Sequence, residues 1–229
     1  MISQWQKLAN FEKLVAAWFF LDAVTHLTME LAYVVLALGP TAAGSRSFWG
    51  WIWSEYARAD VRWSGRDSTI LSIEIMTACI IGPLCFGCFL GYLNKTTWRH
   101  PLALAVSVAE LYGGWMTFVP EWVSSTGALS KDWYHVLVYL FFFNMLWVFV
   151  PIVIIWDCFA AINAAMRTPK PRSSRKPSGG RGSSFSLCST DGTGAPGTGA
   201  WAFVAINLAL YIVLVPLVLL IAAVRDTHT

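Results

Sequence analysis

Asp22, His26 and Glu30 are spaced four residues apart in an otherwise apolar run from about residue 11 to residue 38. In a helix with about 3.6 residues per turn, such side chains lie nearly above one another and form one polar stripe. Ionisable side chains at membrane depth almost always face a cavity or a partner, so the stripe is a candidate functional site. Two plainer interpretations stay open, a surface helix of a soluble bundle and a stripe that serves packing alone.

Three further apolar segments carry polar or aromatic side chains that could face the same interior. They are Glu74 and Thr77, then Glu110 and Tyr112, then Asn144 and Trp147. The chain has no glycine-rich phosphate loop, no hydrolase-type Ser-His-Asp order and no paired His/Cys spacing of the kind that zinc sites use, so we predict neither a metal nor another cofactor. Cys85 and Cys88 lie in an apolar segment without a second pair, and we assign them to helix packing.

Carboxylic acids and a histidine beside an indole in an apolar cavity suit one kind of reaction. Burial disfavours the ionised carboxylate, so a buried Glu can stay protonated and act as an acid. Its target on an apolar substrate is a carbon–carbon double bond, whose protonation creates a carbocation. The face of an indole stabilises such a cation by about 2 kcal/mol or more when water is excluded. A second carboxylate or the imidazole then removes a neighbouring proton, which moves the double bond, or the cation first meets another alkene and closes a ring.

The composition indicates a membrane protein. The chain has 229 residues, of which 56% are hydrophobic and only 13% are charged, whereas soluble domains carry about a quarter charged residues. Crossing about 30 Å of hydrocarbon takes about 20 apolar residues in a helix, which pairs its own backbone groups. Five segments qualify, residues 11–38, 69–93, 101–119, 135–163 and 201–224. We therefore predict an all-α polytopic membrane bundle, a four-helix core followed by a fifth, C-terminal transmembrane helix.

Composition also divides the chain. Residues 167–200 are rich in Pro, Arg, Lys, Ser, Gly and Thr, and such a segment cannot bury a core. We predict a catalytic core over 1–166, a disordered linker over 167–200 and a membrane helix with its tail over 201–229. One side of the membrane would hold ten Lys and Arg residues against six on the other, which places the N-terminus and the linker in the cytosol. The basic run can contact anionic lipids, and it is too short to indicate nucleic-acid binding.

Residues 39–68 form a long connection that is rich in Trp and Tyr. Indoles and phenols favour the boundary between water and lipid, so we expect a lid that lies on the bilayer surface. Asp60 lies two residues from both Arg58 and Arg62, and this close mixture of signs predicts salt bridges that hold the loop.

Several motifs in succession resemble the emopamil-binding protein family, which includes the 3β-hydroxysteroid Δ8,Δ7-isomerases and the sigma-2 receptor branch. The most specific are YARADVRWSGRD at residues 56–67 and IEIMTACIIGPL at residues 73–84. The rest, in the family's order, are His26 with Glu30, Leu111–Tyr112–Gly113 with Glu121, and Asn144 and Trp147 with Pro151 and Asp157. The resemblance covers about residues 15–163.

By position, the resemblance implies that His26 and Glu30 are the proton-donating pair and that Glu74 is the second catalytic carboxylate. Asn144 and Trp147 match the residues that stabilise the cation. Tyr56 and Thr77 match residues near the cavity, and the implied substrate is a hydrophobic polycycle such as a sterol.

Three more side chains are candidates for substrate contact, Asp22, Glu110 and Tyr112. Asp22 lies one turn before the motif and alternatively hydrogen-bonds a neighbouring helix. Glu110 is either a replacement base or one half of a pair between helices.

The chain departs from the family at positions that shape the cavity. Family isomerases carry Gly where this chain has Leu31, Gln and Asp where it has Glu110 and Gly114, and Tyr where it has Trp63. Two substrate classes therefore stay open, a Δ8 sterol and a terpenoid or meroterpenoid that an isomerase or cyclase of specialised metabolism would use. A third hypothesis is a non-catalytic sterol or lipid binder of the sigma-2 receptor type. The resemblance implies the endoplasmic reticulum membrane, and a homodimer is an open alternative.

Overall fold

The computed structural model describes residues 1–167. The predicted linker beyond Arg167 and the predicted fifth helix at residues 201–224 lie outside the described residues.

Four apolar helical runs build the described part of the chain, and each is long enough to cross a membrane. They are Asn10–Leu38, Ser68–Leu93, Arg99–Ser124 and His135–Arg167. Between residues 1 and 167 there is no β-strand. The predicted all-α membrane bundle is therefore confirmed for its four core helices.

Two of the four runs are interrupted by a π-helical turn, and a third begins with a longer π-helical segment. The first consists of α2 (Asn10–Thr25), the turn His26–Glu30 and α3 (Leu31–Leu38). The second consists of α5 (Ser68–Met76), the turn Thr77–Ile81 and α6 (Gly82–Leu93). The third run is α7 (Arg99–Ser124), and the fourth is the π segment His135–Phe143 followed by α8 (Asn144–Arg167). A short helix, α1 (Ile2–Gln6), precedes them.

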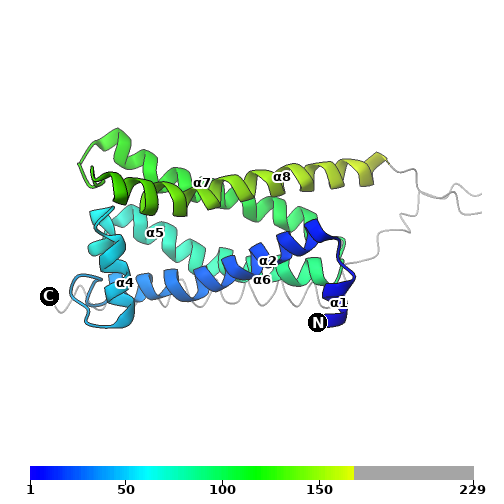
Figure 1. The fold of residues 1–229 in the computed structure, drawn as a ribbon, viewed down its shortest axis with the longest axis horizontal. Coiled ribbons are helices and arrows are strands. Elements are labelled where there is room, and N and C mark those ends of the chain that lie inside the picture. The colour runs from blue at the N-terminus through cyan, green and yellow to red at the C-terminus, as the bar shows by residue number, and fades with distance from the viewer. Residues whose placement is uncertain (168–229) are drawn as a thin grey trace, which may run out of the picture.

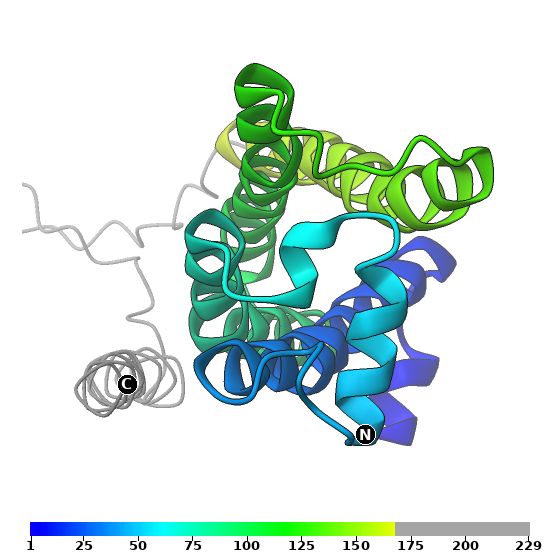
Figure 2. The same cartoon turned by 90° about the vertical axis from the view of Figure 1, so that its left-hand side faces the viewer.

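The bundle packs as two helix pairs, α2 against α6 and α7 against α8 (Figure 1, with the view turned by 90° in Figure 2). Small buried side chains, Ala16, Ala23, Cys85 and Cys88, lie in the core between α2 and α6. Small residues let helix backbones approach closely in membranes, where packing rather than hydrophobic burial holds helices together. The expected packing role of the two cysteines is therefore met, and Cys85 makes a further polar contact described below.

Gly82 and Pro83 mark the change from the second π turn to α6. Proline lacks the N–H that an interior helix position donates, so it is best placed in the first turn of a helix. Pro83 stands at that position of α6. The second helical run is therefore interrupted here by a π turn, and a new helix starts directly after it.

The long connection after α3 folds over one end of the bundle. It contains α4 (Phe48–Tyr56) and a 3-10 turn (Val61–Ser64). Trp53 and Trp63 stack with their planes 3° apart and their centroids 4.8 Å apart, and Tyr33 of α3 packs against both. This buried aromatic cluster ties the segment to the bundle end, and a lid on the bilayer surface stays a prediction for the connection.

A buried ion pair fixes the same connection to α7. Arg62 donates to Asp60 at 2.6 Å and to the carbonyl oxygen of Thr117 at 2.7 Å. Burial alone lowers the pKa of the Arg62 guanidinium, but the hydrogen bonds and charge of Asp60 outweigh burial and raise this pKa above its ordinary value. The predicted salt bridging is confirmed for Arg62, and Arg58 pairs with Glu55 instead.

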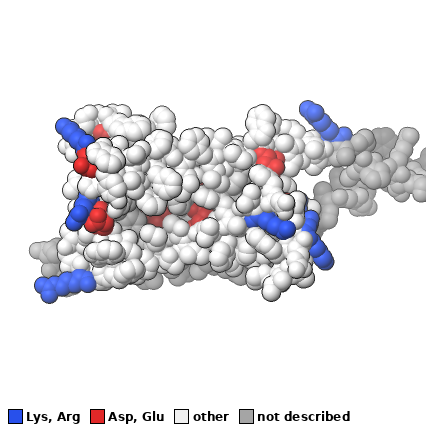
Figure 3. Space-filling model, viewed as in Figure 1, with Lys and Arg blue, Asp and Glu red and all other residues white. Residues whose placement is uncertain are grey.

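Charge is distributed as expected of a chain that crosses a membrane. Figure 3 shows Lys and Arg towards the two ends of the helix bundle, with a belt of uncharged surface residues between them. Acidic atoms are visible in the centre of this belt, between the helices (Figure 3). The protein is therefore an integral membrane protein with carboxyl groups in its interior.

Candidate active site

A cavity of about 610 Å³ opens inside the bundle beneath α4. All four long helical runs and α4 contribute to its lining. Six of the sequence-predicted residues that line it are His26, Glu30, Glu74, Glu110, Asn144 and Trp147. Thr77 and Tyr56 line it too. A cavity of this size is in the range of small-molecule sites, and its titratable groups make it the default candidate for one.

The first π turn holds the histidine and the glutamate against each other. His26 Nδ1 lies 2.5 Å from Glu30 Oε2, and His26 Nε2 lies 3.2 Å from Asp22 Oδ1 on the other side of the ring. The imidazole is therefore clamped between two carboxyl groups. Trp53 Nε1 donates to the carbonyl oxygen of Met29 at 3.0 Å, so an indole of α4 contacts the backbone within the turn. Single π turns inside α-helices frequently occur at functional sites.

Glu74 lies in the last turn of α5, just before the second π turn. Its carboxyl is buried, and its Oε2 has no hydrogen-bond partner among residues 1–167. The two π turns pack against each other, which brings Glu74 opposite Glu30. Thr77 faces the cavity, and its hydroxyl donates to the backbone carbonyl of Glu74 at 3.2 Å. A buried carboxyl that faces an apolar cavity and has one oxygen without a hydrogen-bond partner is suited to exchange a proton with a bound substrate.

The amide of Asn144 is held by two hydrogen bonds at the start of α8. Its Nδ2 donates to the hydroxyl oxygen of Tyr56 at 3.0 Å and to the carbonyl oxygen of Tyr139 at 3.0 Å. Burial raises the pKa of Tyr56 to about 12. The phenol therefore keeps its proton at neutral pH.

The indole ring of Trp147 lines the cavity, and its nitrogen is held by a hydrogen bond on the side away from the cavity. Nε1 donates to Asp22 Oδ1 at 2.7 Å, and Trp18 packs against the ring at a centroid distance of 5.5 Å. The indole is thus fixed on two sides, and its π face is available to a cationic centre in the cavity.

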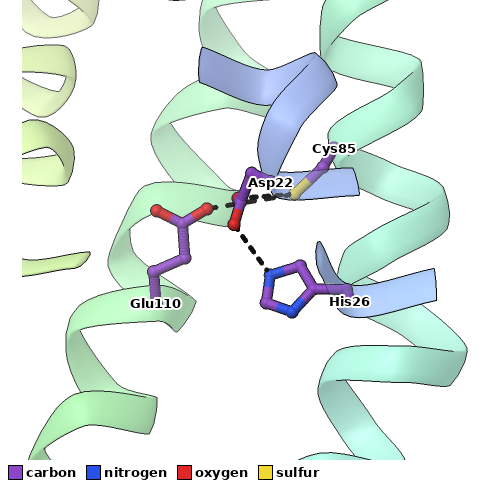
Figure 4. Close-up of side chains that lie close together, drawn as sticks. All are labelled: Asp22, His26, Cys85 and Glu110. Atoms are coloured by element: carbon purple, nitrogen blue, oxygen red, sulfur yellow. Dashed lines mark hydrogen bonds and ion pairs between the residues drawn. The ribbon is translucent and has the colours of Figure 1, made fainter. Parts of the chain in front are cut away.

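Asp22, His26, Cys85 and Glu110 meet behind the cavity, from α2, the first π turn, α6 and α7 (Figure 4). Cys85 Sγ donates to Asp22 Oδ2 at 3.1 Å. One donor atom from each of the four side chains lies within 4.8 Å of the others. Carboxylate oxygen, imidazole nitrogen and thiolate sulfur are ligands that zinc accepts, so this group could hold a metal ion. Sequence spacing did not reveal the group, because its members come from separate helices.

Two expected substrate contacts are not found. Asp22 does not line the cavity, because its carboxyl is turned towards His26, Cys85 and Trp147. Asp22 therefore hydrogen-bonds neighbouring helices, which was the alternative interpretation of this residue. Tyr112 is 60% exposed on the outer face of α7. Two residues beyond Glu110 a helix has turned by about 200°, so Tyr112 faces away when Glu110 faces inward.

Gly114, which the sequence named among the positions that shape the cavity, lines it on α7. Sequence reasoning missed Gly113 beside it, and Glu55 and Tyr139, which line the cavity from α4 and from the fourth helical run. Spacing of three residues from Glu110 was available as a signal for Gly113.

Comparison with known proteins finds one family model and several relatives that are similar to this chain. Residues 48–158 match the family model described as EBP, of the EXPERA or expanded EBP superfamily. The chain is 29% identical over 160 residues to the probable 3-beta-hydroxysteroid-Delta(8),Delta(7)-isomerase of Arabidopsis thaliana, covering 70% of this chain and 71% of that protein. It is 28% identical over 152 residues to the 3-beta-hydroxysteroid-Delta(8),Delta(7)-isomerase of Cavia porcellus, covering 66% and 65%.

A third relative carries a different kind of name. The chain is 27% identical over 159 residues to isomeliandiol synthase of Melia azedarach, which covers 69% of this chain and 74% of that protein. Proteins named as isomerases and as synthases thus match the same chain. The family match over residues 48–158 and these relatives show that the chain is similar to proteins of the EBP family, which supports the resemblance read from its motifs.

Proposed function

We propose that this protein is a cofactor-independent acid–base isomerase that protonates a C=C bond of a sterol-like or terpenoid polycycle inside the membrane. The observation that supports this most is the constellation around the cavity. A His26–Glu30 pair, a second carboxyl at Glu74 and the anchored indole of Trp147 line one apolar space.

The reaction follows from these groups in two steps. The His26–Glu30 pair gives its proton to one alkene carbon, and the electrons of the double bond form the new C–H bond. The cation left on the neighbouring carbon faces Trp147 and the Asn144 amide, which stabilise it without forming a bond. Glu74 then takes a proton from the next carbon, and the released C–H electrons form the shifted double bond. One proton enters and one leaves, so the reaction needs no oxidant, reductant or other co-reactant.

A second candidate is a cyclase that uses the same first step. The synthase names among the relatives favour it, because isomeliandiol synthase and the isomerases match this chain over similar lengths. In that reaction a second alkene of the substrate attacks the cation and forms a carbon–carbon bond before the final proton is lost.

The proposal extends to the setting of the enzyme. We place it in the endoplasmic reticulum membrane with the N-terminus and the linker 167–200 in the cytosol, because Lys and Arg are more frequent on that side. Residues 1–166 form the catalytic core, residues 201–229 provide a further membrane helix, and a homodimer is the assembly to test. Membrane lipids surround the apolar belt and deliver the substrate from the bilayer.

The test is conversion of a Δ8 sterol by membranes that contain this protein in deuterated water. The proposed reaction predicts a migrated double bond with one deuterium in the product. Glu30→Gln should lower kcat at least a hundredfold, the contribution typical of a positioned general acid. Glu12→Gln, which alters a partly exposed carboxyl at the far end of α2, is the matched control. Sterol binding without conversion by the folded wild-type protein would exclude the sterol reaction, and terpenoid alkenes would then be tested for ring closure.

A further inference from the structure

Asp22 and Glu110 form a buried carboxyl pair in the membrane interior. Asp22 is 1% and Glu110 6% exposed, and one oxygen of each lies within 4.8 Å of the other (Figure 4). In the described residues, neither forms an ion pair with a lysine or an arginine. Two ionised carboxylates this close in an apolar setting repel each other strongly, so one of them holds a proton.

The hydrogen bonds decide which member carries the charge. Asp22 receives Trp147 Nε1 at 2.7 Å and Cys85 Sγ at 3.1 Å, and His26 Nε2 lies 3.2 Å away. Glu110 Oε2 has no hydrogen-bond partner among residues 1–167, whereas Oε1 lies 3.9 Å from the Cys85 thiol and the Glu110 carboxyl approaches that of Asp22. Ionised carboxylates are acceptors only and gather donors, so the negative charge belongs on Asp22 and the proton on Glu110.

An ionised Asp22 also determines the tautomer of His26. His26 Nε2 lies 3.2 Å from Asp22 Oδ1, an ion-pair distance outside hydrogen-bond geometry, so the charge of Asp22 favours the tautomer that carries its N–H at Nε2. In that tautomer Nδ1 of the neutral ring accepts the acidic proton of Glu30. The mobile proton is then held between Nδ1 and Glu30, on the side of the ring that faces the cavity. With a neutral residue at position 22, the His26 ring would lose its preference for this tautomer.

We propose that the Asp22–Glu110 pair is a positioning device for the reaction. Glu110 holds the proton of the pair, and Asp22 carries the negative charge. This charge fixes the tautomer of His26 and the orientation of the Trp147 indole. The proposal rests on the proposed isomerase or cyclase function, but it concerns side chains that the minimal acid–base reaction does not use. Asp22 touches no substrate, so it acts through the two residues that do.

Two isosteric variants separate this proposal from a packing role. Asp22→Asn removes the charge, and kcat should fall roughly thirtyfold, the rate equivalent of a desolvated cation–π contact, while KM stays within about threefold. Glu110→Gln keeps a neutral donor toward Asp22, so its kcat should fall only about threefold. Equal losses in the two variants, or the larger loss in Glu110→Gln, would overturn the assignment of charge and proton. Glu12→Gln again serves as the control.

A spectroscopic measurement tests the pair without turnover. In the infrared spectrum of the purified full-length protein, the C=O stretch of a protonated carboxylic acid should weaken in Glu110→Gln and persist in Asp22→Asn. An unchanged band in Glu110→Gln would show that Glu110 is ionised and would refute the proposal. If the wild-type protein binds but converts no alkene, the proposed function fails while this band still decides the state of the pair.

Metal analysis of the same preparation provides the last outcome. The four donor atoms could bind zinc. Stoichiometric zinc in the purified protein, together with loss of activity on chelation, would show that a metal ion occupies the place of the proton and would overturn the proposal. Metal-free protein with full activity supports the carboxyl pair.

Discussion

Trp147 uses two parts of one side chain for two purposes. Its N–H donates to Asp22, which fixes the ring, and its face lines the cavity where the cation forms. The cation–π attraction depends on the orientation of the ring as well as on its presence, because the cation must lie over the face. A substitution at this residue therefore tests both contributions.

Trp147→Phe keeps an aromatic ring but removes the N–H and reduces the π surface. We expect kcat to fall between tenfold and a hundredfold, at the order of a desolvated cation–π contact, with little change in substrate affinity. The control is Trp156→Phe, because Trp156 lies on α8 with 77% of its surface exposed on the outside. Equal kcat in the Trp147→Phe and wild-type proteins would remove Trp147 from the mechanism.

Tyr56 provides a prediction of pH dependence. Burial raises the pKa of Tyr56 to about 12 from an ordinary 10.0, so between these pH values the phenol ionises in the unfolded chain before it ionises in the folded protein. The unfolded state then binds fewer protons, and stability falls as pH rises, by at most about 2.7 kcal/mol. Tyr56→Phe should be less stable than wild type at pH 8, because it loses the bond from Asn144, and the difference should shrink towards pH 12. Thermal unfolding in detergent at both pH values measures this; a constant difference would contradict it.

At the scale of elements, the π turns account for the placement of the acid–base groups. His26 and Glu30 bound one turn, Glu74 lies just before the second, and Asn144 directly follows the third. A π turn widens the helix by one residue and shifts the register of the side chains that follow. Gly82 permits the first two turns to pack closely, since a Cβ there would lie 2.9 Å from His26 Cβ and 3.1 Å from Leu27 Cγ.

Gly82→Ala should therefore separate the two π turns. Overpacking of this kind costs about 1–3 kcal/mol, which offsets the better helix propensity of alanine, so the thermal midpoint should fall. We also expect kcat to fall by an order of magnitude or more, because Glu74 and the His26–Glu30 pair move apart. Gly114→Ala is the matched control for stability, since a Cβ at Gly114 meets nothing within 4 Å. A midpoint in Gly82→Ala equal to that of the control would show that the turns tolerate the methyl group.

For the whole molecule, the length of the apolar segments predicted the helices, and helical spacing predicted which side chains share a face. Four apolar runs became four long helices, and the stripe of Asp22, His26 and Glu30 faces the interior. Contacts between helices were not predictable, because they depend on the rotation and register of each helix. The bond between Asp22 and Trp147 joins residues 125 positions apart, and the thiol of Cys85 meets the same carboxylate from α6. The stacking of Trp53 on Trp63 was not predictable for a related reason, since a boundary-seeking indole and a buried one have the same sequence signal.

Substrate choice is also a property of the whole cavity, and Gly114 offers a way to alter it. The residue lines the cavity on α7, and a side chain added there would enter open space rather than strain the fold. Gly114→Leu should retain or raise the thermal midpoint, because glycine in a helix costs roughly 0.5–1 kcal/mol relative to alanine. It should lower kcat/KM for a polycyclic substrate at least tenfold, the effect expected when added methylenes occupy the space of a ligand.

Val108→Leu, on the outer face of α7, is the control for added bulk. Competition between a tetracyclic sterol and a smaller terpenoid alkene, measured on both proteins, shows whether the added side chain discriminates by size. A shift in favour of the smaller alkene in Gly114→Leu would establish that the polycycle lies against the bare backbone of α7. Equal losses for both substrates would instead place the polycycle elsewhere in the cavity, because a side chain that excludes by volume must penalise the larger ligand more.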